Sequence, residues 1–365
     1  MTNEVDRNHG TVVQAHEIGC LHVAAHPLSA LNGLPPSVSS FTGRVADLAE
    51  LTAHRVVVVS GLGGVGKTEL VLRFAEDNSF PGGQLLWDFH SYDAGRTDAG
   101  AALRSFLLAL GVGDIPEVEA DKARLFRSLV SNREPMLFVL DNVGTAAQVR
   151  PLLVPRHKLI VTSRDLLPAL DAHQLELTAL PVEDAERVTG DAEVARLCDG
   201  LPLALQIMAA LKRSDPDHDW AADLRGRRLN VLKLDDQDLR ATFDLSYRTL
   251  SDDQRRFFRL LSLAGSFVTP DSAAAVCALT GPEILARLRD LRNKHLLESG
   301  NRFHDLVLQY AVERREAEET RSTIEEAADR YDLHLQELRR RRGHWRRIGE
   351  LAECYTSGNL PRYMM

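Results

Sequence analysis

The sequence predicts an α/β fold in which a parallel sheet is wrapped by helices and is followed by smaller helical domains. Short, continuously apolar runs recur through the first half of the chain, and such runs are typical of strands buried on both faces. Amphipathic stretches of helical spacing separate them, an alternation that favours parallel strands joined by helical crossovers. The chain of 365 residues is too long for one core, which indicates several domains.

The expected strands of the sheet are bounded by polar or glycine-rich turns. In chain order they are VVVVS (56–60), QLLWDF (84–89), MLFVLD (136–141), LIVTS (159–163) and LELTAL (175–180). The stretch KTELVLRFAED (67–77) after the first of them has the apolar spacing of an amphipathic helix. We expect the first four strands within an α/β domain at residues 41–171, and the fifth in the same sheet.

The loop after the first strand fits a pattern for binding dinucleotides. Gly61, Gly63 and Gly66 match G-x-G-x-x-G, which seats a pyrophosphate. This fold also needs an acidic residue about 20 positions further on, at the end of a second strand. Asp88 fulfils that requirement, so a dinucleotide site is a real alternative.

A nucleoside triphosphate site explains more of the same loop, which also matches G-x-x-x-x-G-K-[ST]. Lys67 can reach the β- and γ-phosphates and Thr68 can ligate Mg²⁺, whereas neither has a role in a pyrophosphate loop. Backbone N–H groups from Gly63 and Gly64 onward form an anion cradle. Asp141 ends an apolar strand and is the expected second Mg²⁺ ligand. We therefore predict a triphosphate site, with Asp88 as a strand-end cap.

Further motifs follow in a fixed order along the chain. They are FTGR (41–44), HKLIVTSR (157–164), CDGLPLALQIMAALK (198–212) and RFHDLVLQYA (302–311). Together with the loop, this series resembles the NB-ARC branch of the STAND signalling ATPases, over about residues 41–315. The resemblance implies an α/β P-loop NTPase of the additional-strand type that binds ATP or ADP with Mg²⁺. A helical domain, a winged-helix domain and a short α-helical tail would follow.

The resemblance assigns roles to residues that match its motifs. Arg164 looks like the sensor arginine that approaches the γ-phosphate, and Pro202 like the residue that packs the adenine. A proline at this position also suits the first turn of a helix. His304 matches the histidine of the MHD motif, which holds the diphosphate in the closed resting form. Phe303 stands where the methionine is usual and should preserve the apolar packing.

Two positions depart from the family pattern. Asn142 follows Asp141, where relatives that hydrolyse ATP often carry a second acid. Because an amide cannot accept a proton from the attacking water, we expect slow hydrolysis or another base. Phe41 and Arg44 belong to the motif that contacts the nucleotide, but Val45 follows it where glutamate is frequent. The change from glutamate to Val45 should affect the hinge-side contacts more than adenine binding.

The expected domain boundaries follow from these motifs and from changes in composition. They are an N-terminal extension and linker with possible disorder (1–40), the P-loop domain (41–171), a helical domain (172–233), a winged-helix domain (234–315) and a helical tail (316–365). In the winged helix, a turn at Gly300-Asn301 should join two short strands, with His304 on the second. Two apolar stripes in the tail predict paired helices, a possible start of a TPR-like repeat.

Composition limits the classes of partner. The net charge of −8 gives no general case for nucleic acid, and four dispersed cysteines suit a reducing, cytoplasmic compartment. No apolar run is long enough for a membrane span or signal peptide. Basic residues at 287, 289, 292 and 294 flank a buried stripe and form no single DNA-reading face. Six arginines between 339 and 347 could contact acidic partners or nucleic acid, or simply be solvated.

Two functional hypotheses from different classes follow. In the first, the protein is an ATP/ADP switch whose ADP-bound form is closed, and whose ATP-bound form opens, oligomerises with itself and recruits a protein effector. In the second, it is a nucleotide-regulated DNA-binding transcriptional regulator that acts through the winged helix or the arginine-rich tail. A P-loop kinase is disfavoured because the sequence offers no recognisable acceptor site.

Overall fold

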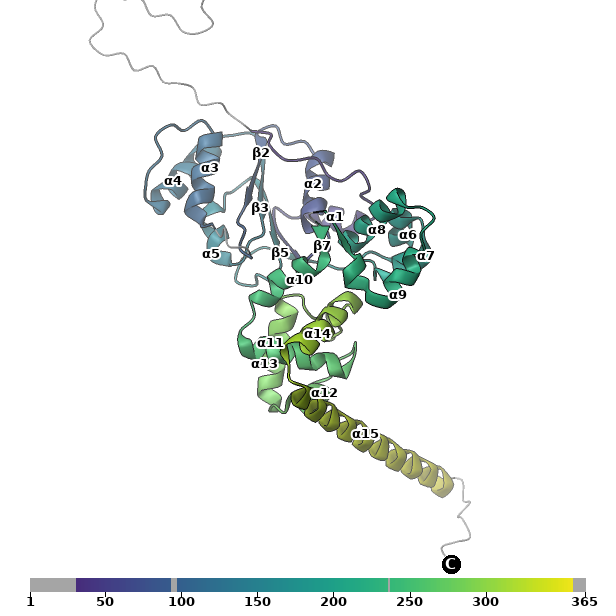
Figure 1. Ribbon diagram of the computed structural model, residues 1–365. Helices are drawn as coiled ribbons and strands as arrows, with labels where there is room; N and C mark the ends of the chain where they lie inside the picture. The colour runs from purple at the N-terminus through teal and green to yellow at the C-terminus, as the bar shows by residue number, and fades with distance from the viewer. Residues whose placement is uncertain (1–30, 93–96, 236, 357–365) are drawn as a thin grey trace, which may run out of the picture.

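The computed structural model describes residues 31–92, 97–235 and 237–356, with the backbone alone at 227 and 341–356. A sheet lies between two groups of helices, and helical segments follow it along the chain (Figure 1). Most of the expected N-terminal extension lies outside the described residues.

The sheet has five parallel strands in the order β2-β3-β4-β1-β5. The strands are β1 (Val56–Gly61), β2 (Gly83–Asp88), β3 (Met136–Asp141), β4 (Lys158–Ser163) and β5 (His173–Leu177). β1 lies between β4 and β5, and every residue of β1 and β3 is buried. This arrangement confirms the predicted α/β P-loop NTPase fold.

Alternate residues of β1 enter two separate cores, because successive side chains of a strand point to opposite faces. Val57 and Val59 pack in one core, and Val56 and Val58 pack in the other. The flanking helices are α1 (Val45–Ala53) and α2 (Lys67–Asp77) on the first face, and α3 (Ala99–Ala109), α4 (Glu119–Val130) and α5 (Ala146–Val149) on the second.

Two boundaries differ from expectation. β5 begins two residues earlier than predicted, and it pairs with β1 up to Leu177, so the sheet extends beyond the expected domain end at 171. The segment expected to be a linker also packs on the domain. The Gln84 backbone N–H donates to Leu31 O at 2.6 Å, and the Ser37 hydroxyl donates to Glu76 Oε2 at 2.6 Å. Residues 31–40 therefore follow the edge formed by β2 and α2.

A helical segment follows the sheet, within the range where a helical domain is expected. It comprises α6 (Val182–Thr189), α7 (Ala192–Leu197), α8 (Pro202–Ser214) and α9 (Trp220–Val231). Asp191 caps α7 by accepting from the backbone N–H groups of Glu193 and Val194. Pro202 is the first residue of α8, as the sequence predicts. A short hairpin leads to the next segment, and its two strands of two residues each are β6 (Lys233–Leu234) and β7 (Gln237–Asp238).

The segment expected to be a winged helix is mainly helical. Its helices are α10 (Leu239–Arg248), α11 (Asp252–Leu261), α12 (Pro270–Cys277), α13 (Gly281–Asn293) and α14 (Asp305–Glu318). The predicted two-stranded wing is reduced to isolated antiparallel bridges of Arg302 with Glu298 and Phe267. His304 is not on a strand, because its Nδ1 accepts from the Leu306 N–H and caps α14.

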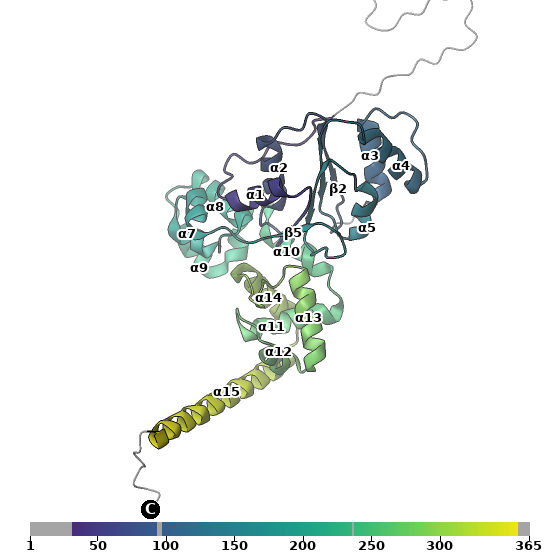
Figure 2. The same cartoon turned by 180° about the vertical axis from the view of Figure 1, so that it is seen from behind.

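The tail is one helix, α15 (Arg321–Thr356), and not the paired helices that the sequence suggested. Figures 1 and 2 both show it extending away from the other domains. Gly343 lies within this helix, and an isolated glycine costs a helix only about 1 kcal/mol relative to alanine. Among the described residues, no helix combines the length and apolar character that crossing a membrane requires.

Candidate functional site

A cavity of about 300 Å³ lies over the loop between β1 and α2. Its walls come from the segment before α1, the loop itself, the ends of β3 and β4, and the start of α8. The predicted site residues that line it are Phe41, Arg44, Gly63, Gly64, Gly66, Lys67, Thr68, Asn142, Arg164 and Pro202. Residues far apart in the sequence are thus brought together around one cavity.

Lys67 is buried at the base of this cavity. Its Nζ donates to Gly61 O at 2.8 Å and to Leu62 O at 3.0 Å. Burial, together with the nearby charge of Arg164, lowers the pKa of Lys67 to about 7, although Asp141 opposes the shift. An anionic phosphate is the kind of group that would restore the charged form of this lysine.

Thr68 and Asp141, which the sequence predicts as Mg²⁺ ligands, lie in contact with each other. The Thr68 hydroxyl donates to Asp141 Oδ1 at 2.9 Å, and the Thr162 hydroxyl donates to the same oxygen. Adjacent ligands of octahedral Mg²⁺ are also about 2.9 Å apart, since each Mg–O bond is about 2.0–2.1 Å long. The two oxygens therefore fit one edge of a Mg²⁺ coordination sphere. Burial raises the pKa of Asp141, and a bound cation would oppose that shift.

The start of α8 packs directly against the phosphate loop. The Leu203 N–H donates to Gly64 O at 3.1 Å, and a Cβ on Gly66 would lie 3.8 Å from the Pro202 ring. Gly66 has a φ of 89° and Gly64 a φ of 82°, conformations that side chains other than glycine rarely adopt. Backbone conformation therefore favours glycine at both positions, and close packing adds to this at Gly64, where a Cβ would lie 3.0 Å from Leu203 Cβ.

Arg44 connects the loop to the sheet edge. Its guanidinium donates to Val65 O at 3.2 Å and to Thr178 O at 2.7 Å, just beyond the end of β5. Phe41 precedes it on the wall of the cavity. Arg44 thus holds the position of the loop, while Phe41 offers an apolar surface to a ligand.

Arg164 links the end of β4 to the helical segment beyond residue 234. Its Nη1 donates to Thr242 O of α10 at 2.7 Å, and the guanidinium lies 5.4 Å from the centre of the Tyr92 ring. A Cβ on Gly63 would lie 2.5 Å from Arg164 Nη1 and 2.8 Å from Thr242 Cγ2. The start of α10 is therefore in contact with both the phosphate loop and the arginine beside it.

The acid next to Asp141 comes from a neighbouring strand. Asp88 pairs with Asp141 in the register of β2 and β3, and its Oδ1 accepts from Asn142 Nδ2 at 3.1 Å. Asp88 also accepts from the His90 N–H, as expected for a strand-end cap. From the sequence, this capping role is the one predicted for Asp88. Asp88 and Asp141 each lie near the end of a predicted parallel strand, and this pattern could have predicted that the two carboxylates are neighbours.

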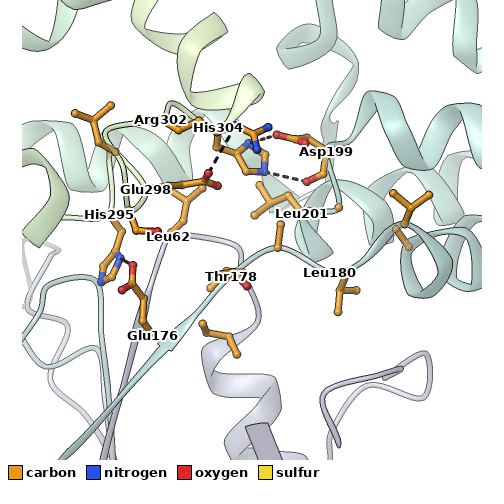
Figure 3. Close-up of a pocket in the computed structure, with 18 of the residues that line it drawn as sticks. Leu62, Glu176, Thr178, Leu180, Asp199, Leu201, His295, Glu298, Arg302 and His304 are labelled. Atoms are coloured by element: carbon orange, nitrogen blue, oxygen red, sulfur yellow. Dashed lines mark hydrogen bonds and ion pairs between the residues drawn. The ribbon is translucent and has the colours of Figure 1, made fainter. Parts of the chain in front are cut away.

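His304 is buried in a different cavity, of about 400 Å³ (Figure 3). Its Nε2 is 3.1 Å from Asp199 O, and the Asp305 N–H donates to Asp199 Oδ2 at 3.0 Å. The two cavities share only Val65 and Leu180 as lining residues. The expected direct contact of His304 with the diphosphate site is therefore not present in this arrangement.

The fold and the loop define a P-loop NTPase. The Walker-type ATPase PABY2304 of Pyrococcus abyssi shares the fold, with a TM-score of 0.53 and 14% identity, over 78% of this chain and 99% of that protein. No profile of a known protein family matches the sequence.

Curated proteins similar in sequence are regulators. The chain is 38% identical to the regulatory protein AfsR of Streptomyces coelicolor and 36% identical to that of Streptomyces griseus, over 76% of this chain and 32% of each relative. It is 28% identical to a putative HTH-type transcriptional regulator of Mycobacterium tuberculosis, over 73% of this chain and 34% of the relative. The chain thus spans about a third of the length of these relatives.

Proposed function

We propose that this chain is an ATP/ADP-dependent switch module of the NB-ARC type that controls a regulatory protein. The observation that carries the proposal is the bond from Arg164 to Thr242 O, because it joins the end of β4, beside the phosphate loop, to α10. Similarity to regulatory proteins supports the regulatory role. We further propose that residues 234–315 act as a winged-helix domain that closes on the nucleotide domain.

The nucleotide would occupy the 300 Å³ cavity. Phe41 and Pro202 would pack against the base, and the backbone N–H groups of the loop would hold the phosphates. Lys67 would move from the carbonyl groups of its own loop onto the β-phosphate. Thr68 and Asp141 would hold Mg²⁺, which neutralises charge between the phosphates when bound.

Switching would depend on which group Arg164 contacts. A γ-phosphate is a stronger acceptor for guanidinium than a backbone carbonyl, because the bond is charge-assisted. ATP would therefore draw Arg164 from Thr242, whereas ADP offers no group at that position. A ligand shifts a conformational equilibrium only through its different affinities for the two states. ADP would thus favour the closed arrangement, and ATP an open one that oligomerises and recruits an effector.

His304 would stabilise the closed arrangement without touching the nucleotide. Through Asp199 it connects the start of α14 to the loop that leads into Pro202. Closing of residues 234–315 would thus affect the wall of the nucleotide cavity at Pro202, where the base would pack.

The names of the relatives favour nucleotide-regulated DNA binding as a second candidate function. Within this chain, however, the C-terminal end of α13 contacts the nucleotide domain. The Leu166 N–H donates to Asn293 O at 2.8 Å, and Lys294 Nζ lies 3.4 Å from Asp165 Oδ1. DNA contact through this end of α13 would therefore require the module to open. The six arginines between 339 and 347 are an alternative candidate for contact with DNA. Steeply salt-dependent duplex binding that decreases when α15 is shortened would support this function.

The decisive experiment is identification of the nucleotide that copurifies with the protein, by denaturation and chromatography. We expect ADP in the wild type and none in Lys67→Ala. A protein that purifies without nucleotide and binds neither ADP nor ATP in calorimetry would contradict the proposal.

A further inference from the structure

A cluster of two histidines and a glutamate lies at the end of the sheet away from the phosphate loop. Glu50 and His54 are in and just after the last turn of α1, and His173 is the first residue of β5. His173 pairs with Val57 near the start of β1, whereas the phosphate loop follows the end of β1. We propose that these three side chains form a binding site for a divalent transition-metal ion of the Zn²⁺ class.

The ligand atoms of the cluster converge. His173 Nε2 lies 3.0 Å and His54 Nε2 3.5 Å from the same oxygen, Glu50 Oε2. All three potential ligand atoms lie within 4.8 Å of one another, and the described residues contain no other such group. Glu50 and His54 are four positions apart, which places side chains on one face of a helix.

These spacings fit tetrahedral coordination by nitrogen and oxygen. With Zn–N and Zn–O bonds of about 2.0–2.2 Å, adjacent ligand atoms are about 3.3–3.6 Å apart. The spacing of 3.5 Å lies in this range, and the spacing of 3.0 Å would need to widen slightly. The two imidazole rings are stacked, with centroids 3.8 Å apart and planes inclined by 7°. One ring must tilt for both lone pairs to point at a single ion, and the His54 side chain is 43% exposed, which leaves room for that motion. Three protein ligands leave a fourth position for water.

The backbone on either side of the cluster is fixed. Lys158 Nζ donates to the carbonyl oxygens of Leu51 and His54, where α1 ends. His173 is held by strand pairing with β1. The positive charge of Lys158 lies beside this site and would oppose cation binding.

A metal at this position would brace α1 against β5. The other end of α1 begins after Arg44, which bonds Thr178 O beyond β5 and Val65 O in the phosphate loop. The ion and Arg44 would thus attach opposite ends of one helix to the same strand region. Because an ion bound only by the folded state stabilises it by mass action, Zn²⁺ should raise the melting temperature.

The site can be tested by Zn²⁺ calorimetry and Co²⁺ absorption spectroscopy on the full chain without an affinity tag. We expect one ion per chain, and visible bands typical of tetrahedral Co²⁺. His54→Ala, His173→Ala and Glu50→Gln should each weaken binding about tenfold or more, since even loss of an outer-shell partner costs about 10–100-fold. Far-UV circular dichroism spectra of the metal-free wild type and variants establish that all are folded.

His218→Ala is the matched control. His218 Nε2 lies 2.8 Å from Asp223 Oδ2 and the side chain is 41% exposed, so it is a comparable histidine–carboxylate pair without a second histidine. Its removal should leave the affinity unchanged. Equal losses in His218→Ala and His173→Ala would mean adventitious binding to surface histidines and would overturn the proposal. Absence of binding would mean that the cluster is held by hydrogen bonds alone. Neither result would affect nucleotide binding, which is measured separately.

Discussion

At the scale of single residues, Lys67 determines how nucleotide affinity depends on pH. Its pKa of about 7 means that much of the buried amine is neutral at pH 8. Phosphate binding favours the ammonium form, so binding above pH 7 should take up about one proton. Affinity for ADP should therefore fall as pH rises from about 7.5 to 9, where free phosphate groups, with a second pKa of about 6, are already deprotonated.

Calorimetry in buffers of different ionisation enthalpy measures this proton uptake. Lys67→Arg retains its charge at every pH in the range and should show no uptake. Lys67→Ala should lose on the order of 100-fold in affinity, because a hydrogen bond to a charged group contributes about 1.5–3 kcal/mol. Proton uptake that persists in Lys67→Arg would assign the effect to another group.

Asn142 is the residue that should limit hydrolysis. It has a φ of 52°, a conformation that aspartate tolerates nearly as well as asparagine. Asn142→Asp would place a carboxylate next to Asp141, and a positioned general base typically contributes about 10²–10⁴-fold. We expect faster single-turnover ATP hydrolysis in Asn142→Asp and no increase in Asn142→Ala. An unchanged rate in Asn142→Asp would contradict this role of Asn142 and would make Asp88 the candidate for the general base.

At the scale of helices and strands, the contact of α10 with the phosphate loop can be disrupted from one position. A Cβ on Gly63 would clash with both Arg164 and Thr242, while Gly63 itself does not have a positive φ. Gly63→Ala should therefore push α10 away and increase hydrogen exchange in residues 239–248. Gly226→Ala is the control, because a Cβ there meets nothing within 4 Å. Unchanged exchange in Gly63→Ala would show that α10 does not depend on this contact.

Sequence patterns predicted the elements whose determinants are local. Apolar runs indicated the five strands, and the loop motif indicated Lys67, Thr68 and the cavity around them. The bond from Arg164 to Thr242 O was not predictable, since it joins residues 78 positions apart through a backbone atom. His304 was expected on a strand, but a short hairpin is marginal alone and packing made this residue a helix cap.

At the scale of the whole molecule, closure depends on contacts between segments that are distant in sequence. His304 and Asp305 both bond Asp199, while Lys294 and Asn293 contact the residues after β4. These contacts, together with that of Arg164, hold residues 234–315 against both the nucleotide domain and the helical domain. Loss of one contact should therefore shift the balance between closed and open forms and leave each domain folded.

His304→Ala tests this coupling most directly. The variant loses the bond to Asp199 O and the cap of α14, at a cost of about 0.5–2 kcal/mol for a helix cap alone. If the closed form retains ADP, the variant should release ADP faster, and the ratio of ATP to ADP affinity should rise. Asp191→Ala, which removes the cap of α7 outside these contacts, controls for loss of a cap as such. His304 lies outside the cavity proposed for ADP. Equal effects in both variants would therefore mean that general destabilisation, and not closure, governs nucleotide release.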